Sequence, residues 1–380
     1  MHRRVALLSA AAIALTGALA PAPAQATGQV TGQVTGQMTG QATGQATARA
    51  ASAQAAGSAL DHGPVGWSGA DTSSERRTVL SYWTPQRMLA ARPLDTPAPR
   101  RSTQSGPTQG TPWATRGASY SAPSSTPSTT TQGRPYAVRP VAAERAAEVL
   151  NNSPGLRWVD GGAVTRTVGR VFFTTADGQN SACSGTAVTS ANESVVITAG
   201  HCVKLNGAAH RNWVFVPGFD NGRRPFGTWV ATALLTTQQW NAGEDINFDV
   251  AAAVVAPLQG RTLTDVVGGQ GVAFNQPRRR QMFAFGYPAA APFDGSRLIY
   301  CSGRAIDDTV QTRDLGLRCN MTGGSSGGPW FAGFNGSTGQ GWLNSVNSFK
   351  YDFAQNFMFG PFFGNEAMAV YRAAQNVGAQ

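Results

Sequence analysis

The sequence lacks a hydrophobic run long enough to span a membrane. Its apolar run at residues 5–20, "VALLSAAAIALTGALA", is shorter than the roughly 20 residues that a bilayer requires, and Pro21 and Pro23 end it. The run follows the charged start "MHRR" and precedes the small residues "PAPAQA", which is typical of an export signal. We therefore expect residues 1–26 to be a signal peptide, with no stable membrane insertion after its removal.

Large apolar residues are scarce in the front third of the chain. From Thr27 the unit Thr-Gly-Gln-Xaa repeats, and Ala, Ser, Pro and Thr follow without order to about Gln132. Such a segment cannot offset its conformational entropy by burial. We expect residues 27–164 to be a low-complexity, largely disordered propeptide or linker, in which only "VAAERAAEVLNN" from Val141 has helical spacing.

Clustered basic residues are also scarce. The formal net charge is +10, but residues 1–164 contribute +7 of it. A nucleic-acid site needs clustered cations interleaved with aromatic residues. The only tight cluster in the back half, residues 278–280, lies in a proline-bounded stretch that we interpret as a solvated loop. We therefore expect no nucleic-acid partner.

No Cys-x-x-Cys pair is present, which argues against a zinc site, and we expect no metal. The four cysteines form an even set in a chain that is predicted to leave the cytoplasm, so two disulfides are expected. Of the three possible connectivities we favour Cys183–Cys202 and Cys301–Cys319. Each of these bridges closes a short segment inside one half of the back region.

From about Thr165 the chain consists of short strand-like runs separated by Gly, Asn, Asp and Pro, such as "TVGRVFFTT", "SVVITA" and "QMFAFGYP". Runs at this spacing indicate an antiparallel barrel or sandwich. The exception is a helical pattern at about residues 364–376, with Asn365 as its expected cap. We therefore predict an all-β fold with a C-terminal helix.

The stretch "GGSSGGPW", residues 323–330, is either a flexible linker or a rigid turn that presents a reactive hydroxyl. Serine is a poor nucleophile unless a neighbouring base takes its proton. Of the two histidines in the back half, His201 follows an apolar strand and precedes Cys202, whereas we expect His210 to lie in a surface loop. His201 is therefore the candidate base for Ser326.

An imidazole base needs a carboxylate on its far nitrogen. The stretch "EDINFDVAAAVV" offers Asp245 and Asp249. Asp249 leads directly into small apolar residues that must be buried, so we expect it to lie at the edge of the core and Asp245 to be solvated. Asp249 is therefore the candidate partner of His201.

Three motifs in this order, "TAGHC", "DVA" and "GSSGGP", resemble those of the chymotrypsin-like serine protease family over nearly all of residues 165–380. The resemblance implies two antiparallel six-stranded β-barrels, at about 165–260 and 261–363. His201 and Asp249 would come from the first barrel and Ser326 from the second.

By this resemblance, Ser326 is the nucleophile, and the backbone amides of Gly324 and Ser326 form an oxyanion hole. Ser325 stands where many family members have aspartate, and the chain lacks the Ile-Val-Gly-Gly start that would pair with it. Both absences suggest a secreted bacterial branch near the glutamyl endopeptidases. Removal of the front segment would then act by uncovering the cleft or by ending assisted folding.

The glutamyl branch has a histidine in the strand that lines its specificity pocket. This chain has no histidine at that place. The corresponding stretch "SVNSF" places Asn347 and Ser348 there, Asn320 is expected at the base of the pocket, and Lys350 at its rim. We expect a polar, uncharged pocket.

The motifs together predict a secreted serine endopeptidase that acts on polypeptides through an acyl-enzyme, as a monomer and with no cofactor. The expected location is extracellular, either free or attached to the cell wall. An alternative is a catalytically silent protease fold kept for binding or adhesion. An esterase is a third reading, but the esterase elbow opens a helix, whereas Ser326 leads into Gly-Gly-Pro.

Overall fold

The computed structural model describes residues 63–94, 136–138 and 151–378. The chain divides into two units, residues 1–57 and 58–380, and every described residue belongs to the second unit. The predicted signal peptide and the helical pattern from Val141 to Leu150 lie outside the described residues. Within the described ranges, no helix combines the length and the apolar character needed to cross a bilayer.

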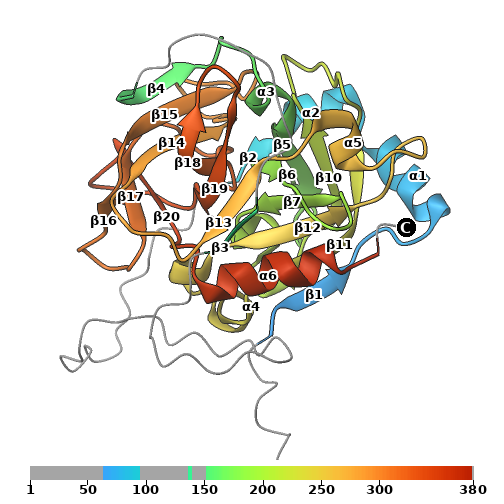
Figure 1. The fold of residues 1–380 in the computed structure, drawn as a ribbon. Helices are drawn as coiled ribbons and strands as arrows, with labels where there is room; N and C mark the ends of the chain where they lie inside the picture. The colour runs from blue at the N-terminus through green and yellow to red at the C-terminus, as the bar shows by residue number, and fades with distance from the viewer. Residues whose placement is uncertain (1–62, 95–135, 139–150, 379–380) are drawn as a thin grey trace, which may run out of the picture. The chain divides into compact units, whose positions relative to one another are not determined.

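Six antiparallel strands close into a ring in the first half of the back region (Figure 1). In this ring β5 pairs with β6 and β10, β11 pairs with β10 and β12, and β7 joins β6 to β12. The strands are β5 (Val168–Thr174), β6 (Asn180–Ala187), β7 (Val195–Thr198), β10 (Arg211–Pro217), β11 (Trp229–Thr236) and β12 (Ala251–Val255). The expected first barrel is confirmed.

The second half is a seven-stranded sheet in the order β3-β13-β19-β18-β14-β15-β4, beside a three-stranded sheet, β16-β17-β20. The pairings among the described strands do not close this sheet into a ring, and β13 and β19 run parallel. The larger sheet contains β3 (Tyr136–Val138), β4 (Ser153–Arg157), β13 (Gly271–Phe274), β14 (Gln281–Gly286), β15 (Ile299–Arg304), β18 (Pro329–Asn335) and β19 (Gln340–Val346). The smaller sheet contains β16 (Ile306–Asp307), β17 (Leu315–Arg318) and β20 (Phe357–Gly360).

The C-terminal helix α6 (Asn365–Gln375) packs against β11 and β12 of the ring (Figure 1). Its N-cap is Gly364 rather than the expected Asn365, whose carboxamide instead accepts a hydrogen bond from Asn275. The remaining short elements are α3 (Val164–Thr167), α4 (Gln238–Gly243), α5 (Leu263–Val267), the 3-10 turns η1 (Gly200–Cys202) and η2 (Ile246–Phe248), and the hairpin of β8 (Lys204–Leu205) and β9 (Ala208–Ala209).

Both expected disulfides are present. Cys183 of β6 is bonded to Cys202 of η1, and Cys301 of β15 is bonded to Cys319. The first bridge therefore ties the turn that contains His201 to the ring.

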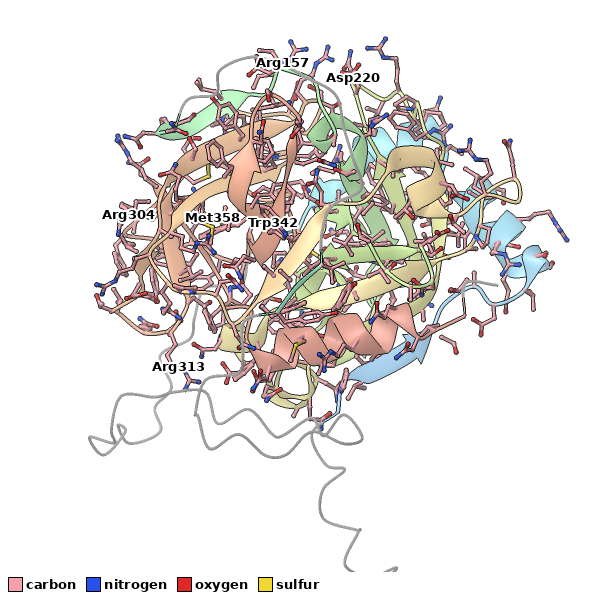
Figure 2. All side chains as sticks on the ribbon, viewed as in Figure 1. Arg157, Asp220, Arg304, Arg313, Trp342 and Met358 are labelled. Atoms are coloured by element: carbon pink, nitrogen blue, oxygen red, sulfur yellow. A yellow bond between two sulfur atoms is a disulfide. The ribbon has the colours of Figure 1, made fainter. Side chains whose placement is uncertain are left out.

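Three exposed arginine side chains lie apart from one another. Arg157, Arg304 and Arg313 point outward at separate places on the rim (Figure 2). The cluster at residues 278–280 is more ordered than the expected solvated loop, because Arg278 and Arg279 both bind the carboxylate of Asp307, each at 2.7 Å.

Part of the front region is folded: the expected disorder does not hold for residues 63–94, nor for β3 and β4, which also lie within residues 27–164. The front segment, residues 63–94, consists of β1 (Val65–Ser68), α1 (Ser73–Tyr82), α2 (Pro85–Ala90) and β2 (Arg92–Pro93). β1 pairs antiparallel with β11, and β2 pairs parallel with β6. In Figure 1 these blue elements lie along the ring.

Trp83 anchors the front segment on the ring. Its side chain is 1% exposed, its indole Nε1 donates to the Asn212 carbonyl at 2.6 Å, and its ring lies 5.6 Å from that of Phe172. One sequence signal for this segment was visible: Thr72 and Glu75 form a reciprocal capping box at the start of α1.

We expect Trp83→Ala to lower the free energy of unfolding by about 3–5 kcal/mol, because it empties a buried aromatic site. Leu89→Ala in the same segment should change it by less than about 0.5 kcal/mol, since Leu89 is 66% exposed. Chemical denaturation of the full chain, with its mass verified, measures both. Equal effects would contradict the packing of Trp83.

Candidate active site

His201 and Asp249 meet, as the sequence predicts. His201 lies in η1, directly after β7, and Asp249 lies between η2 and β12. The imidazole Nδ1 donates to Asp249 Oδ2 at 2.7 Å, and the backbone amide of His201 donates to Asp249 Oδ1 at 2.8 Å. Both side chains are fully buried. The carboxylate therefore fixes both the ring and the backbone of His201.

Ser348 supplies a third hydrogen bond to the same carboxylate, from its hydroxyl to Asp249 Oδ2 at 2.5 Å. Buried charges are stable only when they are paired or hydrogen-bonded. Asp245, the alternative carboxylate, instead caps η2 by accepting from the amide of Asn247 at 3.1 Å. The geometry thus favours Asp249 over Asp245 as the partner of His201.

The loop around Ser326 connects the second sheet to the ring. The carbonyl of Ser326 accepts from the amide of Ser184, on β6, at 2.7 Å. A Cβ added to Gly327, whose φ is +76°, would lie 2.1 Å from the hydroxyl of Thr198 and 2.8 Å from the amide of Ala199. Only glycine fits there, and the loop lies against the end of β7, just before His201.

Several backbone amides of this loop are free to bind a ligand. The amides of Ser325, Gly327 and Gly328 donate to backbone carbonyls, whereas those of Gly323, Gly324 and Ser326 have no acceptor among the described residues. The hydroxyl of Ser325 donates to Thr322 O at 2.7 Å, so the residue in place of the family aspartate is satisfied locally. Pro329 begins β18.

The hydroxyl of Ser326 and Nε2 of His201 are both buried, and neither has a hydrogen-bond partner within the part of the chain that the structure describes. No hydrogen bond joins them in this structure. Since Nδ1 donates to Asp249, Nε2 carries a free lone pair in the neutral ring. His201 can therefore accept a proton at the nitrogen that faces away from Asp249.

The three residues expected in the pocket differ in their surroundings. Asn347 is fully buried, with its carboxamide bonded to Trp330 Nε1, and Ser348 is bonded to Asp249. Of these three residues, only Asn320 has a buried side-chain oxygen without a partner among the described residues, and a Cβ on Gly155 would lie 1.9 Å from it. Asn320 is the one of the three that could still bind another group.

Lys350 is partly buried, and its ammonium donates to the carbonyls of Cys319 and Gln355. Burial lowers the pKa of Lys350 to about 8. Asp314 is a second titratable group near the site with unusual surroundings. It is buried, and neither oxygen of its carboxyl group has a partner among the described residues. Burial, and then the nearby charges of Asp249 and Asp308, raise the pKa of Asp314 well above its usual range.

His210 is not the surface residue that we expected. Its side chain is 5% exposed, its ring stacks on Phe173 at 4.2 Å, and its Nε2 donates to the carbonyl of His201 at 2.9 Å. Burial lowers the pKa of His210 to about 4, so the ring is neutral at physiological pH. Sequence reasoning missed this role because "NGAAHRNW" contains no local sign of burial.

His201 also lies close to the sulfurs of Cys183 and Cys202, with all three ligand atoms within 4.8 Å of one another. Metal ions bind thiolates, and these two sulfurs form a disulfide. This group therefore does not have the chemistry of a metal site.

No protein-family model and no curated protein matches the chain. Among solved structures it is similar to the protease Anisep from Arthrobacter nicotinovorans, with 42% identity over 59% of this chain and 100% of that chain, at a TM-score of 0.55. It is similar too to the thermostable serine protease AL20 from an extremophilic microorganism, with 44% identity over 57% of this chain and 99% of that chain, at a TM-score of 0.54.

A Glu endopeptidase in complex with MPD also aligns, at 14% identity over 59% of this chain and 97% of that chain, with a TM-score of 0.46. Likeness at this level supports no argument about the site. The nearness to glutamyl endopeptidases therefore stays a prediction.

We expect His210→Gln to reduce the acid sensitivity of the fold while keeping an N–H for the His201 carbonyl. Because the pKa of His210 falls from 6.5 to about 4 on folding, only the unfolded chain binds this proton between these values. The contribution of neutral His210 to the free energy of unfolding is complete above pH 6.5 and is lost as the pH falls through 4. The free energy of unfolding changes by about 3 kcal/mol over this range.

Chemical denaturation between pH 7 and pH 4 measures this difference. The wild type should lose about 3 kcal/mol more free energy of unfolding than the variant. Equal losses would show that His210 is not held neutral in the fold.

Proposed function

The chain belongs to the family of chymotrypsin-like serine proteases, and on that premise we propose that it is an endopeptidase whose nucleophile is Ser326. The observation that carries the proposal is the buried hydrogen bond between His201 and Asp249, beside a serine loop in which the amides of Gly324 and Ser326 have no acceptor among the described residues. These are the parts that acyl transfer requires.

In the proposed reaction, Ser326 Oγ attacks the carbonyl carbon of a peptide bond while Nε2 of His201 takes its proton. Asp249 keeps the Nδ1–H tautomer in place and stabilises the imidazolium that forms. His201 then gives the proton to the leaving amine, which produces the acyl-enzyme. Water, activated by the same imidazole, releases the acyl group and restores the hydroxyl of Ser326.

The amides of Gly324 and Ser326 are proposed to bind the negatively charged oxygen of the tetrahedral intermediate. Gly324 has a φ of +90°, a region that favours glycine, and a Cβ there would lie 3.0 Å from Ala289 Cβ and Tyr287 O. One donor of this kind contributes about 10²–10³-fold to turnover. The shape of the loop therefore matters as much as the hydroxyl.

We also propose that the protein acts outside the cytoplasm on polypeptides, as a monomer and without a cofactor. The two disulfides support export, since such bonds persist in oxidising compartments. The relatives are proteases, which supports polypeptide substrates. Asn320 is the proposed contact for the substrate side chain, because its buried oxygen is unpartnered among the described residues.

We expect Ser326→Ala to abolish hydrolysis of casein and labelling by a fluorophosphonate probe while leaving the fold intact. Asp249→Asn should lower kcat by about 10⁴-fold, because the wrong tautomer would form at His201. Asp245→Asn is the matched control and should retain near-normal rates. Unchanged hydrolysis by Ser326→Ala would refute the assignment, and a folded wild type that the probe does not label even after loss of residues 63–94 would favour the binding-module alternative.

We propose further that the front region, residues 27–164, contains a propeptide whose segment 63–94 shields the nucleophile. The amide of Leu94 donates to the carbonyl of Ala182 at 3.1 Å, two residues from the Ser184 amide that holds Ser326. The front segment thus ends on the same strand, β6, that positions the serine loop. We propose that an extended substrate pairs with this same edge of β6, so that the front segment and the substrate exclude one another.

The relatives support a removable front region. The match to Anisep covers 59% of this chain, about 224 residues, which is fewer than residues 151–378 alone. Since the whole Anisep chain is matched, that solved chain has no counterpart to most of the front region.

We expect the intact chain to react slowly with a fluorophosphonate and to gain reactivity as residues 63–94 are lost. The wild type is incubated, and samples taken over time are treated with the fluorophosphonate. Gel electrophoresis then measures the labelling, and mass spectrometry measures the loss of residues 63–94. Full-length Ser326→Ala should stay intact alone and be cut when processed wild type is added. An intact chain that reacts as fast as the processed form would contradict the shielding role.

A further inference from the structure

We propose that the side chains of Ser184 and Asn347 are positioning residues that orient the oxyanion donors. This inference rests on the proposed function. It starts from the serine loop, where glycines at 323, 324, 327 and 328 leave the peptide planes free to rotate. A loop of this composition needs outside contacts to hold its amides in one orientation.

Those contacts act through the carbonyls. In a trans peptide the N–H and the preceding C=O point in opposite directions, so a held carbonyl fixes the direction of the next amide. The carbonyl of Gly323 controls the amide of Gly324, and the carbonyl of Ser325 controls the amide of Ser326. The carbonyl of Gly324 belongs to the plane between these two.

Asn347 holds the plane that carries the Ser326 amide. Its Nδ2 donates to Ser325 O at 3.0 Å and to Phe285 O at 2.9 Å, and its Oδ1 accepts from Trp330 Nε1 at 2.7 Å. An indole N–H can only donate, so Oδ1 must face Trp330 and Nδ2 must face Ser325. The orientation of the carboxamide is therefore determined, and all its groups are used.

Ser184 holds the central plane. Its hydroxyl donates to Gly324 O at 2.9 Å and accepts from the amide of Tyr287 at 2.9 Å. Its own amide donates to Ser326 O at 2.7 Å, and its carbonyl accepts from the hydroxyl of Thr198 at 2.8 Å. Ser184 is fully buried, so no water replaces its hydroxyl when that group is removed.

Backbone contacts complete the arrangement but do not replace the two side chains. The amide of Ala289 donates to Gly323 O at 2.7 Å, and that of Gly328 donates to Ser325 O at 2.9 Å. Between these two anchored carbonyls, Gly324 O has the hydroxyl of Ser184 as its donor. Without it, the buried carbonyl of Gly324 has no donor, and the plane between the two oxyanion amides is held only by the amide of Ser325, which donates to Thr322 O at 3.2 Å. A shift of this plane changes the angle between the two oxyanion amides.

Ser184→Ala removes this hydroxyl with no change in backbone. We expect kcat for a peptide amide to fall by about 10–10²-fold, less than the loss of a whole donor, with KM changed by less than about threefold. A peptide aldehyde, whose adduct places an oxyanion in the hole, should lose affinity in proportion to kcat/KM. Asn347→Ala, which removes the donor to Ser325 O, should show the same pattern.

Ser345→Ala is the matched control. Its hydroxyl is equally buried and donates to one backbone carbonyl, Pro361 O, at 2.8 Å, away from the serine loop. It should lose comparable stability by chemical denaturation but keep wild-type kcat and aldehyde affinity. A purely structural role would make Ser184→Ala behave in the same way.

A folded Ser184→Ala or Asn347→Ala with kcat and aldehyde affinity within twofold of the wild type would overturn the inference. Failure of the proposed function looks different, because then the wild type itself, even after loss of residues 63–94, would neither hydrolyse peptides nor react with a fluorophosphonate.

Discussion

The hydrogen bond from the amide of Ser184 to the carbonyl of Ser326, at 2.7 Å, joins the two halves of this protein at the site. Ser326 belongs to the loop before β18 of the second sheet, whereas His201 and Asp249 belong to the ring. Directly before Ser184, the disulfide of Cys183 continues the connection to the turn of His201. The groups of the site can act together only while this hydrogen bond and the disulfide keep the second sheet and the ring in a fixed relative position.

Burial makes the hydrogen bonds around the site decisive. A carboxylate that loses water needs donors to replace it, and Asp249 accepts from the amide and ring of His201 and from Ser348. Asp314 lies in the same acidic region without such donors among the described residues, and its pKa is raised. The difference between the two acids comes from their donors, because both are buried.

The sequence predicted those parts of the site that have local signatures. His201 and Asp249 were identified from an apolar strand before one and an apolar strand after the other, and the structure confirms their contact. The two disulfides followed from the short segments that they close. The role of Ser326 as nucleophile stays a proposal.

The missed features depend on residues that are far apart in the chain. His210 was expected in a loop because its burial comes from Phe173 and the carbonyl of His201. Asn347 was expected to line a pocket. The sequence could not show that its carboxamide bonds to Trp330 and Phe285, because these residues lie on other strands. The folded front segment was missed for the same reason, since its few apolar side chains are buried only against the ring.

The sequence by itself determined the resemblance to a protease family, the expectation of two disulfides and the succession of strands, because each depends on residue types and spacings that are local in the chain. Only the tertiary structure decided which polar side chains are hydrogen-bonded inside the fold and which remain free to bind another group. That decision follows from burial: a polar group that loses water must find a partner, and the partner is set by the packing of distant strands.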